Sequence, residues 1–511
     1  MTPRARIEFG DFQTPRSLAD QVLSLLVSRG IKPTAIVEPT CGKGSFVQSA
    51  MEVFDCPLWA FEINASYLDE LRPTVAKRVT ICQQDFFERD WRAFFASLPD
   101  NVLILGNPPW ATNATLGAMK STNLPEKSNF QSRGGLAAKT GKANFDISEW
   151  MLIKLAEAIG QRSATIAMLC KTSTARKFLR HAWNTGKGVS SVSLHAINAA
   201  EHFGAAVDAC LLICHLNRGA IQQTADIFNS LTQRETTQTL GFVGRELVAN
   251  VAEYARLSDL EGIAYYRWRS GAKHDASRVM EFERNESGKY VNGFGEAVDL
   301  EDECVHPLLK SSDLGNGRLQ PRKYVMLTQR QMGEDTKALR ESAPKTWAYL
   351  LAHAAYLDAR GSSIYRESAR FAVFGVGPYT FAPWKVAISG LYKSLRFSVV
   401  GPFDGKPIVF DDTCYFAACD TRKEAEFLAE LLQSELAKRF FSSLVFLDSK
   451  RPLTTDILHR LDIKRVAERL GREAEFRKIL KSADRLVAQT HLVYERPKKV
   501  TPETLVRRAR A

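Results

Sequence analysis

The sequence predicts an α/β protein that begins with a mostly parallel sheet, covered on both faces, and continues into a mixed α+β region. Short apolar runs alternate with amphipathic segments up to residue 217, and the periodicity after residue 245 is less regular. Seven runs have the length of strands: Ala35–Glu38, Leu58–Glu62, Val79–Gln83, Val102–Gly106, Ala164–Leu169, Val189–His195 and Val207–His215.

Helices and one long insertion complete the expected N-terminal domain, residues 1–217. The spacing of apolar residues predicts helices at Ser17–Ser28 and Ile147–Ile159. The last two strands follow closely on one another, which favours an antiparallel hairpin at one edge of the sheet. Residues 111–146 are rich in Asn, Ser, Thr, Lys and Gly. A loop of this length is usually functional, and we expect it to close over bound substrate; an ordinary surface insertion is the alternative.

The second half of the chain is expected to hold a linker, a further domain and a tail. Residues 218–245 are polar and rich in Gln and Thr, which is typical of a linker; residues 246–495 would form the second domain and residues 496–511 a basic tail. Its expected strands are Tyr324–Thr328, Phe371–Gly375, Ala387–Ser389 and Tyr415–Ala418, and its expected helices lie near Lys423–Phe441 and Thr454–Gln489.

Composition narrows the class of protein. A chain of 511 residues is long enough for two or three domains, and a net charge of +12 fits a polyanionic partner. The sequence contains neither an apolar stretch of ~20 residues nor an apolar leader, so we expect a cytoplasmic protein without a membrane segment. Nine scattered cysteines without a CxxC pair indicate reduced thiols, and we expect no metal site.

The tetrapeptide Asn107-Pro108-Pro109-Trp110 directly follows the apolar run Val102–Gly106. It therefore lies where a parallel strand ends, which is where open α/β sheets bind ligands. The prolines stiffen the turn and hold the Asn107 side chain and the Pro108 carbonyl as two fixed acceptors. Two acceptors beside the flat face of Trp110 suit the exocyclic amine of a base. A plain turn with a buried Trp is the alternative.

Three other strand ends carry groups that suit a nucleoside cofactor. Gly42 and Gly44 follow the first strand and allow a tight turn close to a ligand. Glu62 ends the second strand, where an acid suits ribose hydroxyls. Asp85-Phe86 follows the third strand and suits an adenine ring. The full G-x-G-x-x-G and P-loop patterns are missing from this turn, which argues against a nicotinamide cofactor and against a nucleoside triphosphate.

With these motifs the chain resembles the gamma-class adenine-N6 DNA methyltransferases of bacterial restriction–modification systems. Phe12-Gln13-Thr14-Pro15 matches the segment that precedes the Gly turn in that family, and the order of the later motifs agrees. The resemblance covers about residues 9–215 and is looser beyond. It implies a Rossmann-like catalytic domain that uses S-adenosylmethionine, followed by a target-recognition domain. The Trp at position 110 stands where Tyr or Phe is commoner.

The resemblance also implies residue roles. Asn107, Pro108, Pro109 and Trp110 would form the catalytic turn, with Trp110 and Phe203 stacking on the target base. Asp146, which precedes the helix Ile147–Ile159, would line the cofactor pocket or serve only as a helix cap. The cofactor would be held by Phe12, Thr14, Pro15, Glu38, Pro39, Thr40, Gly42, Gly44, Glu62, Ile63, Asp85, Phe86, Asn107 and Pro109.

The implied partner is double-stranded DNA, from which the target adenine flips out. Basic clusters such as Lys393/Arg396 and Lys450-Arg451 in the second half would contact phosphates. We expect a monomer and, where a cognate restriction endonuclease exists, a separate polypeptide for it. Asp335-x-Lys337 and Asp448-x-Lys450 resemble half of a nuclease motif, but no Pro-Asp half lies suitably upstream.

Other functions stay open at this point. A methyltransferase of the same motif class acting on RNA or on a protein glutamine would also present a planar nitrogen to Asn107. Cytosine-N4 methylation needs only small changes around the pocket. A binding-only specificity subunit with a decayed site is the alternative that is not an enzyme, and the intact motif series argues against it.

Overall fold

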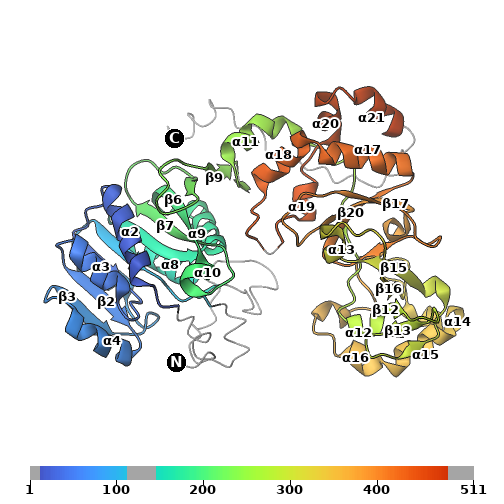
Figure 1. Cartoon of the computed structure of the whole chain (residues 1–511), viewed down its shortest axis with the longest axis horizontal. Coiled ribbons are helices and arrows are strands. Elements are labelled where there is room, and N and C mark those ends of the chain that lie inside the picture. The colour runs from blue at the N-terminus through green and yellow to red at the C-terminus, as the bar shows by residue number, and fades with distance from the viewer. Residues whose placement is uncertain (1–11, 112–145, 245, 450, 481–511) are drawn as a thin grey trace. The chain divides into compact units, whose positions relative to one another are not determined.

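The computed structural model describes residues 12–111, 146–244, 246–449 and 451–480. The chain divides into two compact units, Met1–Val251 and Ala252–Ala511 (Figure 1). The division therefore lies past the expected end of the first domain. Among the described residues, we find no helix long and apolar enough to cross a membrane.

The first unit is built on a sheet that has ten strands within the described residues, in the order β10-β9-β8-β6-β7-β5-β4-β1-β2-β3. β1 to β5 pair with one another in parallel, so their carboxyl ends lie at the same edge of the sheet. The bounds are β1 (Ala35–Glu38), β2 (Leu58–Glu62), β3 (Val79–Gln83), β4 (Val102–Gly106), β5 (Ala164–Lys171), β6 (Val189–Ile197), β7 (Ala209–Leu216), β8 (Thr224–Phe228), β9 (Gln238–Val243) and β10 (Glu246–Val248).

Two expectations for this sheet were wrong. The segment 218–245 is not a linker, because β8 pairs in parallel with β6 and β9 and β10 continue the sheet. The hairpin β6–β7 consequently lies inside the sheet and not at its edge. These added strands alternate buried residues with exposed polar ones, so their composition resembles that of a loop even though one face is packed.

Helices cover both faces of this sheet. Alternate strand residues such as Ile36 and Leu103 pack in a core with one set of helices, whereas their neighbours Val37 and Ile104 are buried on the other face. The first set is α2 (Arg16–Ser28), α3 (Ser45–Val53), α4 (Ala65–Leu71) and α10 (Ala199–Phe203). The second set is α5 (Trp91–Ala96), α8 (Ile147–Ile159) and α9 (Thr172–Asn184).

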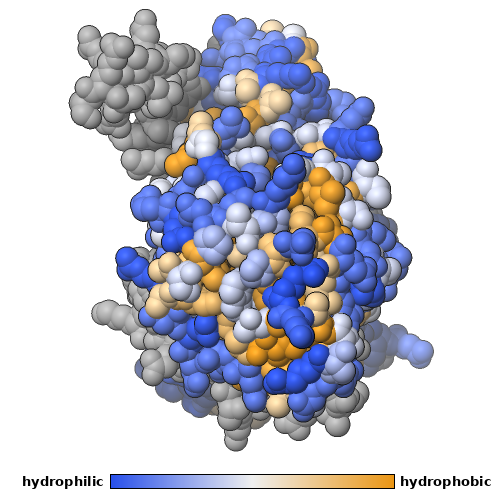
Figure 2. Space-filling view, turned by 90° about the vertical axis from the view of Figure 1, so that its left-hand side faces the viewer, coloured by the Kyte–Doolittle hydropathy of each residue, from blue (hydrophilic) through white to orange (hydrophobic). Residues whose placement is uncertain are grey.

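The outer strand β3 pairs with β2 alone and keeps its side chains partly exposed. Figure 2, which looks onto the left-hand side of Figure 1, shows a mostly hydrophilic surface with hydrophobic side chains gathered in small groups. β3 is short, and Lys77 and Arg78 precede it. Short strands beside charged residues are poor templates for edge-to-edge association.

The described residues of the second unit form two sheets. One has the order β11-β20-β17-β18 and the other β14-β13-β12-β16-β15-β19. The strands are β11 (Arg269–Ser270), β12 (Glu281–Arg284), β13 (Tyr290–Asn292), β14 (Ala297–Val298), β15 (Val305–Leu309), β16 (Lys323–Met326), β17 (Trp384–Ser389), β18 (Ser398–Val400), β19 (Val409–Phe410) and β20 (Cys414–Cys419).

The two longest helices in the described part of this unit, α17 and α18, lie in the second half of its chain. The α-helices are α11 (Val251–Leu257), α12 (Ser277–Met280), α13 (Ser311–Gly315), α14 (Leu339–Ser342), α15 (Pro344–Ala352), α16 (Ala354–Asp358), α17 (Arg422–Gln433), α18 (Glu435–Leu444), α19 (Thr455–Leu458), α20 (Ile463–Arg469) and α21 (Glu473–Leu480). The 3-10 turns are η1 (Arg72–Thr74), which lies in the first unit, η2 (Ser258–Leu260), η3 (Asp302–Cys304), η4 (Thr336–Ala338), η5 (Ser363–Tyr365) and η6 (Pro378–Phe381).

The mixed α+β character expected of this unit is therefore present, with local differences. The segment Phe371–Gly375 forms a single bridge, between Phe374 and Lys273, and no strand. The expected helix Lys423–Phe441 is broken at Ser434, whose hydroxyl accepts a hydrogen bond from the Ala437 N–H and so caps a new helix. Up to residue 480, the expected helix Thr454–Gln489 is split into the short helices α19, α20 and α21, and its last residues, 481–489, lie outside the described part of the chain.

Candidate functional site

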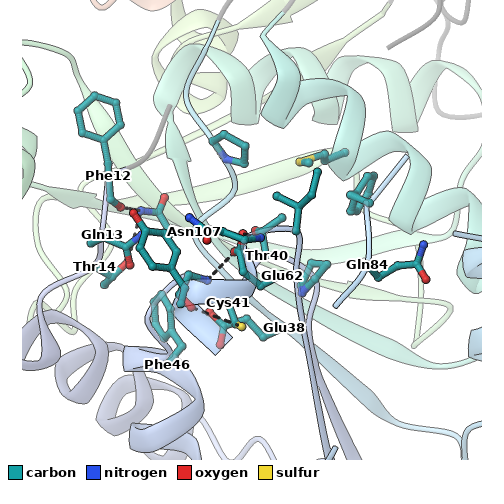
Figure 3. A pocket seen from close by; sticks show the side chains of 18 of the residues that line it. Phe12, Gln13, Thr14, Glu38, Thr40, Cys41, Phe46, Glu62, Gln84 and Asn107 are labelled. Atoms are coloured by element: carbon teal, nitrogen blue, oxygen red, sulfur yellow. Dashed lines mark hydrogen bonds between the residues drawn. The ribbon is translucent and has the colours of Figure 1, made fainter. Parts of the chain in front are cut away.

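A cavity of about 360 Å³ lies at the carboxyl ends of β1, β2, β3 and β4 (Figure 3). It is the edge of a parallel sheet at which ligands are expected. Of the predicted site residues, it is lined by Phe12, Thr14, Glu38, Pro39, Thr40, Gly42, Glu62, Ile63, Asp85, Phe86, Asn107 and Pro109. Pro15, Gly44, Pro108, Trp110 and Phe203 are not among its lining residues.

Sequence reasoning missed several lining residues. They are Gln13, Cys41, Ser45, Phe46, Asn64, Tyr67, Gln84, Phe87, Ile147 and Met151. Most are direct neighbours of the predicted motifs, so the motif positions were the available signal. Ile147 directly follows Asp146, which was predicted to line the pocket. Tyr67 and Met151 carried no signal, because their places depend on how α4 and α8 pack against the sheet.

Gly42 and Gly44 serve different purposes in the turn after β1. Both have left-handed backbone angles, with φ of 53° and 84°. The Gly42 N–H lies in the cavity wall and donates to Glu62 Oε2 over 2.9 Å. A Cβ on Gly44 would lie 2.3 Å from Leu71 Cδ1. Gly44 therefore allows close packing of α4, and Gly42 brings backbone to the cavity.

Glu38 and Glu62, two of the acidic residues that line the cavity, have different surroundings. Glu62 is held by backbone N–H groups, since its Oε1 also accepts from Asn64 over 2.9 Å. Glu38 is buried, and its Oε2 has no hydrogen-bond partner among the described residues. Burial raises the pKa of Glu38 well above its usual range, and the nearby charge of Glu62 raises it further. A cationic ligand beside Glu38 would favour its carboxylate form.

These groups fit S-adenosylmethionine. The buried Glu38 oxygen has an unused acceptor that suits the cationic methionine end. Glu62 is held by the N–H groups of Gly42 and Asn64 at the end of β2, the place where an acid would suit ribose hydroxyls. Asp85 accepts from the Phe87 N–H over 2.8 Å, which fixes its orientation next to the ring of Phe86.

The amide of Asn107 is oriented by the segment that precedes α2. Its Nδ2 donates to the Phe12 carbonyl over 3.0 Å and to Thr14 Oγ1 over 3.3 Å. Because a carbonyl can only accept, the nitrogen must face Phe12. Asn107 Oδ1 is consequently the acceptor that these contacts leave unused. It is buried, and within the described part of the chain it has no hydrogen-bond partner.

An aromatic cluster adjoins this amide. The Trp110 ring lies 5.8 Å from that of Phe12 and 5.1 Å from that of Phe203, between centroids. Trp110 and Phe203 are each only 5% exposed, and the indole N–H has no partner among the described residues. The structure thus brings the two predicted stacking residues together, behind the lining of the cavity.

The expected insertion, residues 111–146, lies outside the described residues except for its two ends. Asp146 caps α8, accepting from the Ser148 N–H over 3.1 Å, and does not line the cavity. The first turns of α8 line it instead, through Ile147 and Met151.

Comparisons with known proteins give two extensive likenesses. The Type II methyltransferase M.NspV of Nostoc sp. (strain ATCC 29411 / PCC 7524) is 40% identical over 475 residues, which cover 91% of this chain and 98% of that protein. The Type IIL restriction-modification enzyme MmeI, solved in complex with DNA, is 12% identical with a TM-score of 0.54, covering 90% of this chain and 69% of that one.

Other likenesses cover a smaller share of the chain. A precorrin-6y C5,15-methyltransferase from Geobacter metallireducens is 16% identical with a TM-score of 0.22, over 39% of this chain and 88% of that one. No protein-family model matches the chain. The likeness to MmeI shows that the fold of both units together occurs in a restriction–modification enzyme.

Proposed function

This chain belongs to the Type II methyltransferases of restriction–modification systems, and from that premise we propose that it methylates the N6 amine of adenine in double-stranded DNA. Its methyl donor is S-adenosylmethionine. The observation that supports the proposal is Asn107 Oδ1, a buried acceptor of a cavity-lining residue that has no hydrogen-bond partner within the described part of the chain.

The proposed chemistry begins with the nucleophile. The lone pair of an adenine amine is delocalised into the ring, which makes the nitrogen a poor nucleophile. Asn107 Oδ1 and the Pro108 carbonyl would accept its two protons, which draws the nitrogen toward tetrahedral geometry. Both acceptors are held before the base arrives, so they stabilise the positive charge that develops on the nitrogen without rearranging.

The bound cofactor supplies a methyl group already activated by its sulfonium. Glu38 would face the cationic methionine end, Glu62 the ribose and Asp85 with Phe86 the adenine. Pro109, which lines the cavity, would place the amine acceptors against the methyl group. Alignment of two bound reactants supplies up to ~7–11 kcal/mol of the barrier reduction, so this pocket needs mainly to orient.

The proposed DNA substrate requires base flipping. An amine inside the duplex cannot reach a methyl donor in a buried cavity, so the adenine must leave the stack. Trp110 and Phe203 would receive it and offset part of the lost stacking. The charge of +12 suits a DNA partner, and MmeI binds DNA. We assign target recognition to the second unit, with a monomeric enzyme and any cognate endonuclease on a separate chain.

The test is methyl transfer from labelled S-adenosylmethionine to random-sequence duplex DNA, digested to nucleosides and resolved by mass. The proposal expects the label in 6-methyladenine and its loss in Asn107→Ala. Label in N4-methylcytosine would contradict the choice of base. Parallel reactions use RNA and glutamine peptides as substrates. Label in either of these, with none in DNA, would contradict the proposal that the substrate is DNA.

A further inference from the structure

Lys171, the last residue of β5, joins two elements beside the Asn107–Trp110 turn. Its Nζ donates to the Trp110 carbonyl over 3.1 Å and to Asp146 Oδ2 over 2.6 Å. The side chains of Lys171 and Asp146 are 20% and 6% exposed. Screening by water is therefore weak, and the ion pair is more than a surface contact.

The turn needs such an external contact because of its own sequence. Pro108 and Pro109 have no N–H, so the middle of the tetrapeptide offers the protein only carbonyl oxygens as backbone handles. β5 runs parallel to β4 with Met168 opposite Gly106, and it continues to Lys171 past the end of β4. The extension places an ammonium group alongside the turn.

Asp146 connects the same contact to α8. Its Oδ2 pairs with Lys171, whereas its Oδ1 accepts from the Ser148 N–H and hydroxyl. The next residue, Ile147, donates its N–H to the Ala111 carbonyl over 2.9 Å. The carbonyls of Trp110 and Ala111 are thus both held, one by Lys171 and one by the start of α8, and α8 also lines the cavity.

We infer that Lys171 and Asp146 are positioning residues that hold the Asn107–Trp110 turn at the distance from the cavity that methyl transfer requires. The inference rests on the proposed function, since it takes the turn to be the place where the amine is activated. Neither side chain lines the cavity, so the pair acts through the turn and does not touch the cofactor.

A matched control exists on the neighbouring helix. Lys177 of α9 lies with its Nζ 3.4 Å from Glu149 Oε2, and the Glu149 side chain is 1% exposed. This pair also joins α8 to its neighbour and also involves a buried carboxylate, whereas it is the ammonium of Lys171 that donates to the turn itself. Lys177→Met therefore removes a comparable ion pair without the positioning effect.

The experiment compares Lys171→Met, Lys171→Arg and Lys177→Met in the full chain. Single-turnover methyl transfer to duplex DNA, the Kd for S-adenosylmethionine by calorimetry and thermal unfolding are measured for each. We expect Lys171→Met to slow transfer about a hundredfold, the cost of a misplacement near 1 Å, with an unchanged Kd. Lys171→Arg should recover most of the rate, because a guanidinium can donate to the same two oxygens.

Three results would overturn the inference. Lys171→Met could transfer methyl groups at the wild-type rate, could lose rate only in step with cofactor affinity, or could match Lys177→Met in every measurement. Should Lys171→Met fail to fold, Asp146→Asn keeps the helix cap and breaks the pair, and the same expectations apply to it. Transfer to a base other than adenine would refute the proposed N6 activity while the ratio of rates still tested the positioning role.

Discussion

The substitution Asn107→Asp removes the hydrogen-bond donor of the Asn107 amide and keeps its acceptor, so it tests the orientation of the amide. The substitution keeps one oxygen where Oδ1 lies and replaces Nδ2 with a second oxygen, 3.0 Å from the Phe12 carbonyl and 3.3 Å from Thr14 Oγ1. An ionised carboxylate cannot donate to the carbonyl, so the side chain loses its anchor and turns away.

The magnitude follows from the contact with the Phe12 carbonyl, because the Thr14 hydroxyl can turn and donate to a carboxylate oxygen. The lost hydrogen bond costs about 0.5–1.5 kcal/mol, and the two facing oxygens add repulsion, so about 2–3 kcal/mol, or roughly 30- to 150-fold in rate, is expected for the ionised form. Protonation returns an O–H that donates to the Phe12 carbonyl. The partly buried site raises the pKa of the introduced carboxyl above about 3.9, so the rate should rise as the pH falls.

The assay is single-turnover methyl transfer at pH 6, 7 and 8, with cofactor and DNA saturating so that titration of Glu38 does not enter. Asn107→Ala serves as the reference, with a loss of about 10²–10³-fold that does not respond to pH in this way. Wild-type rates in Asn107→Asp, or a pH profile parallel to that of Asn107→Ala, would refute the assigned orientation of the amide.

Three further predictions test the cavity and the packing around it. Because a cation favours the Glu38 carboxylate, whose pKa is raised, S-adenosylhomocysteine should bind more tightly as the pH rises and its binding should release protons. Calorimetry in two buffers should find that this proton release is missing in Glu38→Gln. Equal proton release from the wild type and from Glu38→Gln would contradict the prediction. Gly44→Ala should lower the free energy of unfolding in urea by about 1–3 kcal/mol. The control is Gly30→Ala, at a glycine with a similar φ and open space around it, which should cost less because its Cβ does not meet Leu71. Equal losses in the two variants would contradict the clash. Burial lowers the pKa of Lys385 to about 7, so between pH 7 and 9 the unfolded chain binds a proton that the folded chain does not. The free energy of unfolding of the wild type should therefore rise relative to that of Lys385→Met, by up to about 1.4 kcal/mol per pH unit. A difference between the two proteins that stays constant with pH would contradict this prediction.

The sequence predicted those elements that appear in it as a run of residues with a recognisable apolar pattern. The strands β1 to β4 have the bounds expected from the sequence. β1 and β4 are fully buried, and buried parallel strands are continuous apolar runs. β8 to β10 were missed because strands that keep polar, partly exposed residues resemble loops in composition. At the site, strand ends indicated Glu38, Glu62 and Asn107, all of which line one cavity.

Residues that act through tertiary contacts could not be found in this way. Lys171 follows an apolar strand like many surface lysines, and its contact with the Trp110 carbonyl depends on β5 outlasting β4. The burial of Trp110 between Phe12 and Phe203 likewise depends on the packing of α10. A motif gives the identity of such residues but not their neighbours.

The most direct measurement is a map of modified bases, at single-base resolution, in the genomic DNA of a bacterial host that lacks adenine methylation and expresses this chain. We predict 6-methyladenine at one recurring short sequence with the wild type and none there with Asn107→Ala. Modified cytosines in place of adenines, or unmodified DNA from cells that contain the folded wild-type enzyme, would contradict the proposed function.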